Sequence, residues 1–154
     1  MGKFKYGFYG TLTTGSLVKI FSALEKEAGM HKGDTFCDFG AGLGGVLLFA
    51  QALGYSSYGV EFDGDKARQA YTACCLAYKR YRVEFGHLSD EMESKLLWYE
   101  VDEIKNVTTQ FMPTGASVFF SFWQGIPAED LEHIGRLAVA CPNFRLFCFV
   151  ERGN

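Results

Sequence analysis

The sequence lacks the features of a membrane or secreted protein. Its 154 residues contain no apolar run long enough to cross a bilayer. The N-terminal segment has Lys3 and Lys5, but no apolar stretch or cleavage pattern follows them, so it does not fit a secretory signal peptide. We therefore expect an intracellular protein, either cytoplasmic or nuclear.

An excess of charge of one sign is also lacking. Lys and Arg number 15 against 18 Asp and Glu, which gives a net charge of -3. Such a chain has no overall positive field to attract a phosphate backbone. The basic run at residues 79–82 is explained by its place at the end of a predicted helix, where cations are favourable. The sequence thus carries no strong signal for nucleic-acid binding.

Cysteine pairs at metal-binding or disulfide spacing are absent. The five cysteines are an odd number and contain no C-x-x-C pair, which argues against a disulfide framework and against a structural zinc site. We expect them to be reduced packing residues. The three histidines have no partner at ligand or triad spacing, so no metal site is predicted.

What the sequence does contain is ample material for one core. Apolar residues make up 48% of the chain and aromatic residues 16%. No internal repeat or linker is present, and the three prolines fall between apolar segments. We therefore predict a single domain over residues 1–154.

Short apolar runs alternate with helical patterns along the chain. The predicted strands are residues 35–38, 57–61, 96–101, 116–122 and 144–150, and the predicted helices are 16–28, 44–53, one from 65 and one from 127. Ser16 is the expected cap of the first helix. Residues 116–122 are apolar except Ser117 and Ser121, which predicts a central strand. Alternating strands and helices indicate a Rossmann-like, doubly wound α/β fold with a mainly parallel sheet of about five strands.

The most informative segment is residues 36–45, where a strand leads into a glycine-rich turn and then a helix. Gly40, Gly42 and Gly45 satisfy the pattern G-x-G-x-x-G. Glycines allow a ligand to lie against bare main chain, and a helix start offers free N–H donors. The segment therefore predicts a ligand-binding turn.

Three carboxylates beside this turn indicate the kind of ligand. Asp38 precedes the first glycine, where it opposes a pyrophosphate and suits a cation such as the ammonium group of S-adenosylmethionine. Glu61 ends the second strand and is placed to accept hydrogen bonds from ribose hydroxyls, as in NAD sites too. Asp102, after the third strand, is placed to accept from an adenine amino group. The alternatives are a turn cap for Asp38, a surface carboxylate for Glu61 and a carboxylate without a ligand for Asp102.

Residues 36–44, followed by Tyr58-Gly59-Val60-Glu61, resemble the class I S-adenosylmethionine-dependent methyltransferases, and the resemblance covers residues 9–150. Within that class the chain is most similar to the non-SET histone-lysine methyltransferases of the disruptor-of-telomeric-silencing family. That family carries a Tyr-Gly-Glu-type segment where this chain has Tyr9-Gly10-Thr11. The class normally continues with an antiparallel hairpin after the fifth strand, and we expect this chain to lack it.

The resemblance also implies a cofactor site and a catalytic site. Tyr9, Thr11 and Thr14 would lie over the methionine part of the cofactor. The complete predicted cofactor-binding set is Tyr9, Thr11, Thr14, Asp38, Gly40, Gly42, Gly44, Glu61, Phe62 and Asp102. Tyr9, Ser121 and Trp123 are the predicted catalytic residues, since aromatic walls stabilise a cation and Ser121 is placed to orient a nucleophile.

The sequence therefore predicts an S-adenosylmethionine-dependent methyltransferase that works by in-line displacement. The resemblance makes a protein lysine the first acceptor to consider, with nucleic acid or a small molecule open. A second hypothesis is a non-catalytic cofactor-binding module that needs a partner chain, and a third is a dinucleotide-dependent oxidoreductase.

The fifth predicted strand bears on possible partners. It has Arg145 as its one charged residue, and it is expected to border the sheet. Such an edge favours pairing with another strand. We expect self-association or a partner chain at this strand, unless residues 1–9 fold over it and leave a monomer.

Overall fold

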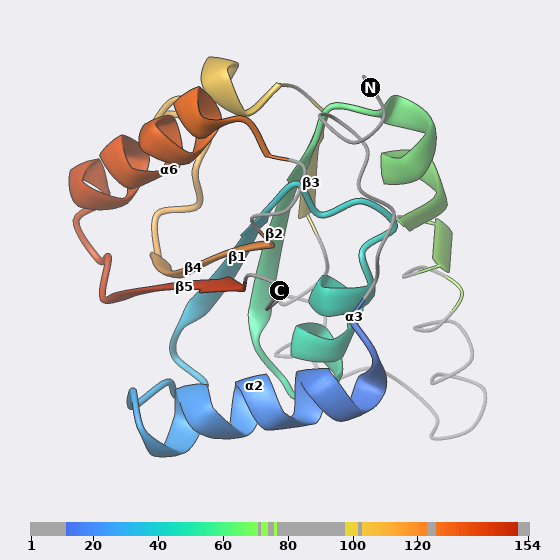
Figure 1. The fold of residues 1–154 in the computed structure, drawn as a ribbon, viewed down its shortest axis with the longest axis vertical. Helices are drawn as coiled ribbons and strands as arrows, with labels where there is room; N and C mark the ends of the chain where they lie inside the picture. The colour runs from blue at the N-terminus through green and yellow to red at the C-terminus, as the bar shows by residue number, and fades with distance from the viewer. Residues whose placement is uncertain are drawn as a thin grey trace.

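The fold is built around one parallel β-sheet (Figure 1). The computed structural model describes residues 12–70, 72, 73, 76, 98–101, 103–122 and 126–150. The strands are β1 (Thr35–Phe39), β2 (Ser56–Glu61), β3 (Trp98–Val101), β4 (Ala116–Phe122) and β5 (Leu146–Val150). All their pairings are parallel, which confirms the predicted α/β fold with a parallel sheet.

The order of the strands locates the place where a ligand can bind. The sheet runs β3-β2-β1-β4-β5, so the chain proceeds outward from β1 in one direction and then returns to β4 on the other side. Neighbouring connections diverge at such a reversal and leave a crevice beyond the carboxyl ends of the strands. The strand order therefore predicts a crevice at the carboxyl ends of β1 and β4.

Helices cover both faces of the sheet, with α6 on one side and α2 and α3 on the other (Figure 1). Their bounds are Thr14–Lys26 for α2, Gly45–Ala52 for α3 and Ala128–Ala140 for α6; residues 64–70 are also helical, and η1 (Ile104–Asn106) is a short 3-10 turn. Because side chains alternate along a strand, Phe36 packs against α2 and α3, whereas Cys37 and Phe39 pack against α6. Each face therefore has its own apolar core.

The expected cap of the first helix is wrong by three positions. The Thr13 side chain accepts the Ser16 N–H at 3.1 Å and caps α2, so the helix already includes Ser16. Thr and Ser are both favourable N-cap residues. Here Thr13, which comes first in the chain, reaches the amide three positions on and takes the N-cap position. At α6, Glu129 and Asp130 lie in the first turn, where negative charges are favourable.

Strand β4 has the central position that its composition predicts. It lies between β1 and β5, and its residues from Ala116 to Ser121 are buried. Of the cysteines in the described residues, Cys37 and Cys141 are buried free thiols and Cys148 is a partly buried one. The other two cysteines lie outside the described residues.

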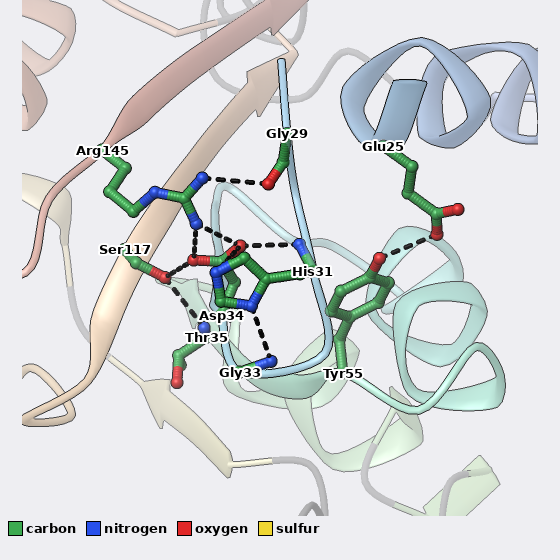
Figure 2. Close-up of polar contacts among 9 residues, drawn as sticks. All are labelled: Glu25, Gly29, His31, Gly33, Asp34, Thr35, Tyr55, Ser117 and Arg145. Atoms are coloured by element: carbon green, nitrogen blue, oxygen red, sulfur yellow. Dashed lines mark hydrogen bonds and ion pairs between the residues drawn. The ribbon is translucent and has the colours of Figure 1, made fainter. Parts of the chain in front are cut away.

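An ion pair links two segments of the chain at the amino ends of the strands, as Figure 2 shows. Arg145, just before β5, donates to both carboxylate oxygens of Asp34 at 2.7 Å and to the carbonyl oxygen of Gly29 at 2.9 Å. The Asp34 side chain is only 3% exposed and also accepts the backbone N–H of His31 at 2.9 Å. This clasp joins the segment after α2 to the beginning of β5.

A polar residue of β4 belongs to the same network. The Ser117 hydroxyl donates to Asp34 at 2.8 Å and accepts the Thr35 N–H at 3.0 Å, which explains a serine in an otherwise apolar strand. Beside it, the Tyr55 hydroxyl donates to Glu25 at 2.7 Å and ties β2 to α2 (Figure 2). The amino edge of the sheet is therefore fixed by buried polar contacts, opposite to the crevice at the carboxyl edge.

Two searches of the described residues bear on broader function. None of their helices has the length and apolar character that crossing a membrane requires. No group of three or more His, Cys, Asp and Glu side chains in the same residues is arranged to hold a metal ion.

Candidate functional site

The glycine-rich turn joins β1 to α3 at the carboxyl edge of the sheet. Gly40, Gly42 and Gly44 have φ angles of 79°, 57° and 80°, in the region that favours glycine. Gly44 is the N-cap of α3, and Gly45, although it completes the G-x-G-x-x-G pattern, is an ordinary first helical residue. The glycines that shape the turn are therefore 40, 42 and 44.

The two sides of the turn differ in how much room they leave. A Cβ atom placed on Gly42 would meet no atom of the described residues within 4 Å, so these residues leave space beside the main chain there. A Cβ atom on Gly40 would lie 3.3 Å from Cδ1 of Ile126, which precedes α6. The segment before α6 thus packs over the start of the turn and leaves its middle accessible.

The amides of the turn are bonded to β2. The N–H groups of Gly40 and Ala41 donate to the Val60 carbonyl oxygen at 2.8 and 3.0 Å, and the Gly42 N–H donates to Oε1 of Glu61 at 2.9 Å. The N–H groups of these three residues are therefore already bonded, whereas the free donors expected from the sequence are those of the helix start. A phosphate placed here would meet a carboxylate where it needs donors.

Glu61 is fixed in the centre of the site. It is 5% exposed, and its second oxygen accepts the Asp63 N–H at 2.9 Å, so the alternative of a surface carboxylate is wrong. Each carboxylate oxygen has two acceptor positions, and one N–H per oxygen leaves another for a ligand. Glu61 thus holds the turn and retains acceptor capacity for a pair of hydroxyl groups.

Asp38 is the second buried carboxyl group at this edge. It is 4% exposed, and none of the described residues donates a hydrogen bond to its side chain. Because the turn amides bond to Val60 and Glu61, Asp38 is not the cap of the turn. Burial, and then the negative charge of Glu61, raise the pKa of Asp38 to about 8. A buried carboxyl group without a partner is a suitable place for a cation.

The remaining predicted site residues fall into two groups. Phe62, directly after Glu61, is 54% exposed; Thr14 is the exposed first residue of α2; Ser121 is buried, with its hydroxyl donating to the Phe39 carbonyl oxygen at 3.5 Å. Four others lie outside the described residues, namely Tyr9, Thr11, Asp102 and Trp123. The roles of both groups stay predictions.

Three participants were not anticipated from the sequence. The Val60 carbonyl oxygen and the Asp63 amide fasten the turn and Glu61, and Ile126 covers Gly40. Backbone groups carry no signal in a sequence, and the apolar Ile126 is not distinguishable there from a core residue. These contacts depend on how the connections lie against one another.

Comparisons with known proteins establish the fold. No family model and no curated protein matches the chain. Among solved structures, an RNA methyltransferase from Salinibacter ruber bound to S-adenosyl-L-homocysteine is similar with a TM-score of 0.53 at 13% identity, over 73% of this chain and 60% of that one. A SAM-dependent methyltransferase from Geobacter sulfurreducens, also bound to S-adenosyl-L-homocysteine, gives 0.55 at 16%, over 88% and 48%.

A dimethyladenosine transferase from Plasmodium falciparum gives a TM-score of 0.60 at 18% identity, over 92% of this chain and 41% of that one. The chain thus spans less than two thirds of the length of each of these three proteins. The similarity confirms the predicted Rossmann-like fold, which this chain shares with these three proteins.

Proposed function

We propose that this chain binds S-adenosylmethionine and acts as an S-adenosylmethionine-dependent methyltransferase. The observation that carries the proposal is the pair of buried carboxyl groups, Asp38 and Glu61, at a glycine turn where the described residues leave space beside Gly42. Structures of the same fold contain S-adenosyl-L-homocysteine, which supports this choice of ligand.

The residues present fit the parts of this cofactor. Asp38 is a buried carboxyl group to which no described residue donates, which suits an ammonium group. Glu61 has acceptor positions for the ribose hydroxyls, and the exposed ring of Phe62 offers an apolar surface for adenine. The open main chain at Gly42 leaves room between them.

When bound, the sulfonium group supplies an electrophilic methyl group. The contribution of this chain is then to bind, orient and exclude water, which suffices for much of the rate of a displacement between aligned partners. Ser121 is the last residue but one of β4 and pairs with Phe39 at the end of β1, and its hydroxyl donates to the Phe39 carbonyl oxygen. In this proposal Tyr9, Ser121 and Trp123 border the reacting methyl group.

A dinucleotide cofactor fits the same turn less well. The Gly42 N–H is occupied by Glu61, and Asp38 adds a second carboxyl group. A pyrophosphate requires N–H donors or cations at this position. We therefore keep a dinucleotide-dependent oxidoreductase only as an outcome to test.

Calorimetric titration of the chain with S-adenosylmethionine, S-adenosylhomocysteine and NAD tests the cofactor. We expect the first two to bind and NAD not to bind. Binding of NAD alone, or of none of the three by a folded chain, would overturn the proposal.

A protein lysine, as in histones, is the acceptor that we propose to examine first, on the resemblance of Tyr9-Gly10-Thr11 and Tyr58-Gly59-Val60-Glu61. Two positions differ from that family, since Thr11 replaces a glutamate and residues 121–124 replace an Asn-Asn-Phe run. Methyl transfer from labelled cofactor to mixed histones, peptides and RNA identifies the acceptor class. Cofactor binding without transfer to any of them would favour a module that needs a partner chain.

A further inference from the structure

We propose that ligand binding at this site is a proton-for-cation exchange: the free chain holds a proton on Asp38, and the ammonium group of the ligand displaces it. This inference rests on the proposed function, because it takes the ligand to carry an amino-acid group. It adds a number of protons released on binding and a pH dependence of the affinity, neither of which cofactor binding alone implies.

Two buried carboxyl groups at one edge create the need for such a proton. Asp38 lies one residue from the end of β1, opposite Gly59, and Glu61 ends the adjacent β2. Both side chains are at least nine-tenths buried. Two negative charges that are buried on neighbouring strands are much less favourable than one charge and one neutral carboxyl group.

The hydrogen bonds indicate which of the two groups is neutral. Both oxygens of Glu61 accept a backbone N–H, from Gly42 and Asp63. Such donors favour a negative charge on the acceptor. Asp38 has no donor in the described part of the chain, so the proton belongs on Asp38.

The other titratable groups near Asp38 do not supply a cation. Cys37 precedes it on β1 but packs on the α6 face, and burial raises the pKa of that thiol, with Cys141 and Asp38 adding to the effect. The Asp63 carboxylate accepts the N–H groups of residues 65 and 66, at the start of the next helix. In the described residues no Lys, Arg or His forms an ion pair with Asp38 or Glu61. The pKa of Asp38, raised to about 8 by burial and by Glu61, agrees with a proton held at neutral pH.

An ammonium group beside Asp38 reverses the balance. A positive charge in contact favours the ionised carboxylate, so the proton leaves to the solvent as the ligand enters. Below pH of about 8, the affinity for such a ligand should rise by up to about tenfold per pH unit, because one proton is released in the same step. A ligand without the amino-acid group leaves the proton in place.

The test counts protons in a titration of the chain at pH 7 with S-adenosylhomocysteine. The heat of binding is measured in buffers with different ionisation enthalpies, and its slope gives the number of protons released. The control ligand is 5′-methylthioadenosine, which keeps the adenosine part and lacks the amino-acid group. We expect close to one proton for S-adenosylhomocysteine and none for the control ligand.

The variant Asp38→Asn provides a matched control, because its amide has nearly the same shape and no titrating proton. It should bind S-adenosylhomocysteine more weakly and release no proton. If this variant does not fold, the comparison of the two ligands on the unaltered chain still decides the question.

The outcomes separate the two proposals. If S-adenosylhomocysteine does not bind to the folded chain, the proposed function fails. If it binds and the unaltered chain releases no proton, only the exchange is overturned. Equal proton release with both ligands would also overturn the exchange, because the release would then not depend on the ammonium group.

Discussion

Replacing Arg145 with alanine should destabilise the fold, while the carboxyl edge of the sheet, where the candidate site lies, stays intact. The change removes two bonds of 2.7 Å to Asp34 and one of 2.9 Å to the Gly29 carbonyl oxygen. Breaking a buried ion pair costs about 3–5 kcal/mol. Here the Arg145 side chain is 39% exposed, so water replaces part of what is lost, and Asp34 keeps the donors from His31 and Ser117. We expect a loss of about 2–3 kcal/mol in the free energy of unfolding.

The pH dependence of this loss follows from Asp34. Burial alone would raise its pKa, but the hydrogen bonds from His31, Ser117 and Arg145, with the charge of Arg145, outweigh burial and lower the pKa below 3.8. A carboxyl group whose pKa is lower in the folded state contributes stability that is complete above pH 3.8 and is lost as the pH falls through the folded value. The difference between the unaltered chain and Arg145→Ala should therefore shrink below pH of about 4.

Urea unfolding followed by circular dichroism measures both effects, at pH 7 and at several values below pH 4. The control is Arg136→Ala, which removes an ion pair of 2.7 Å with Glu132 on the surface of α6. Its side chains are 62% and 71% exposed, so the expected loss is at most about 0.5 kcal/mol. If Arg145→Ala costs no more than Arg136→Ala at pH 7, the clasp does not stabilise the fold.

Three further predictions concern the site and the sheet edge. Glu61→Ala should weaken S-adenosylhomocysteine binding at least tenfold, since hydrogen bonds to a charged group contribute about 1.5–3 kcal/mol each; unchanged affinity in calorimetry would contradict the role of Glu61. Gly42→Val should abolish binding with a native circular dichroism spectrum, because the side chain enters the open space of the turn at a φ of 57°, whereas retained binding would place the ligand elsewhere. We also propose that the chain self-associates through β5, which borders the described sheet. Light scattering over a dilution series should show this, and Phe147→Lys should reduce it; a mass of 17.2 kDa at every concentration would refute it.

Local patterns in the sequence were sufficient to predict the five strands of the sheet and to place the candidate site at their carboxyl ends. The apolar run with Ser117 and Ser121 indicated a central strand, and the bounds of β4 agree with it. The strand-to-helix glycine turn and the carboxylates Asp38 and Glu61 were identified from the sequence alone, because they stand at the ends of predicted strands. In a parallel sheet the carboxyl ends lie together, so the alternation of strands and helices already brings these groups to one edge.

The tertiary structure decided how those residues use their hydrogen bonds. The sequence predicted a ligand-binding glycine turn but not its hydrogen bonds: Gly42 donates to Glu61, 19 positions away, because the two connections pack against each other. The clasp between Asp34 and Arg145 joins residues 111 positions apart, and it gives Ser117 its buried partner. A periodic pattern reports which face of an element is apolar. The pairing of individual polar groups depends on strand register and on the approach of distant segments, which are fixed only when the chain folds.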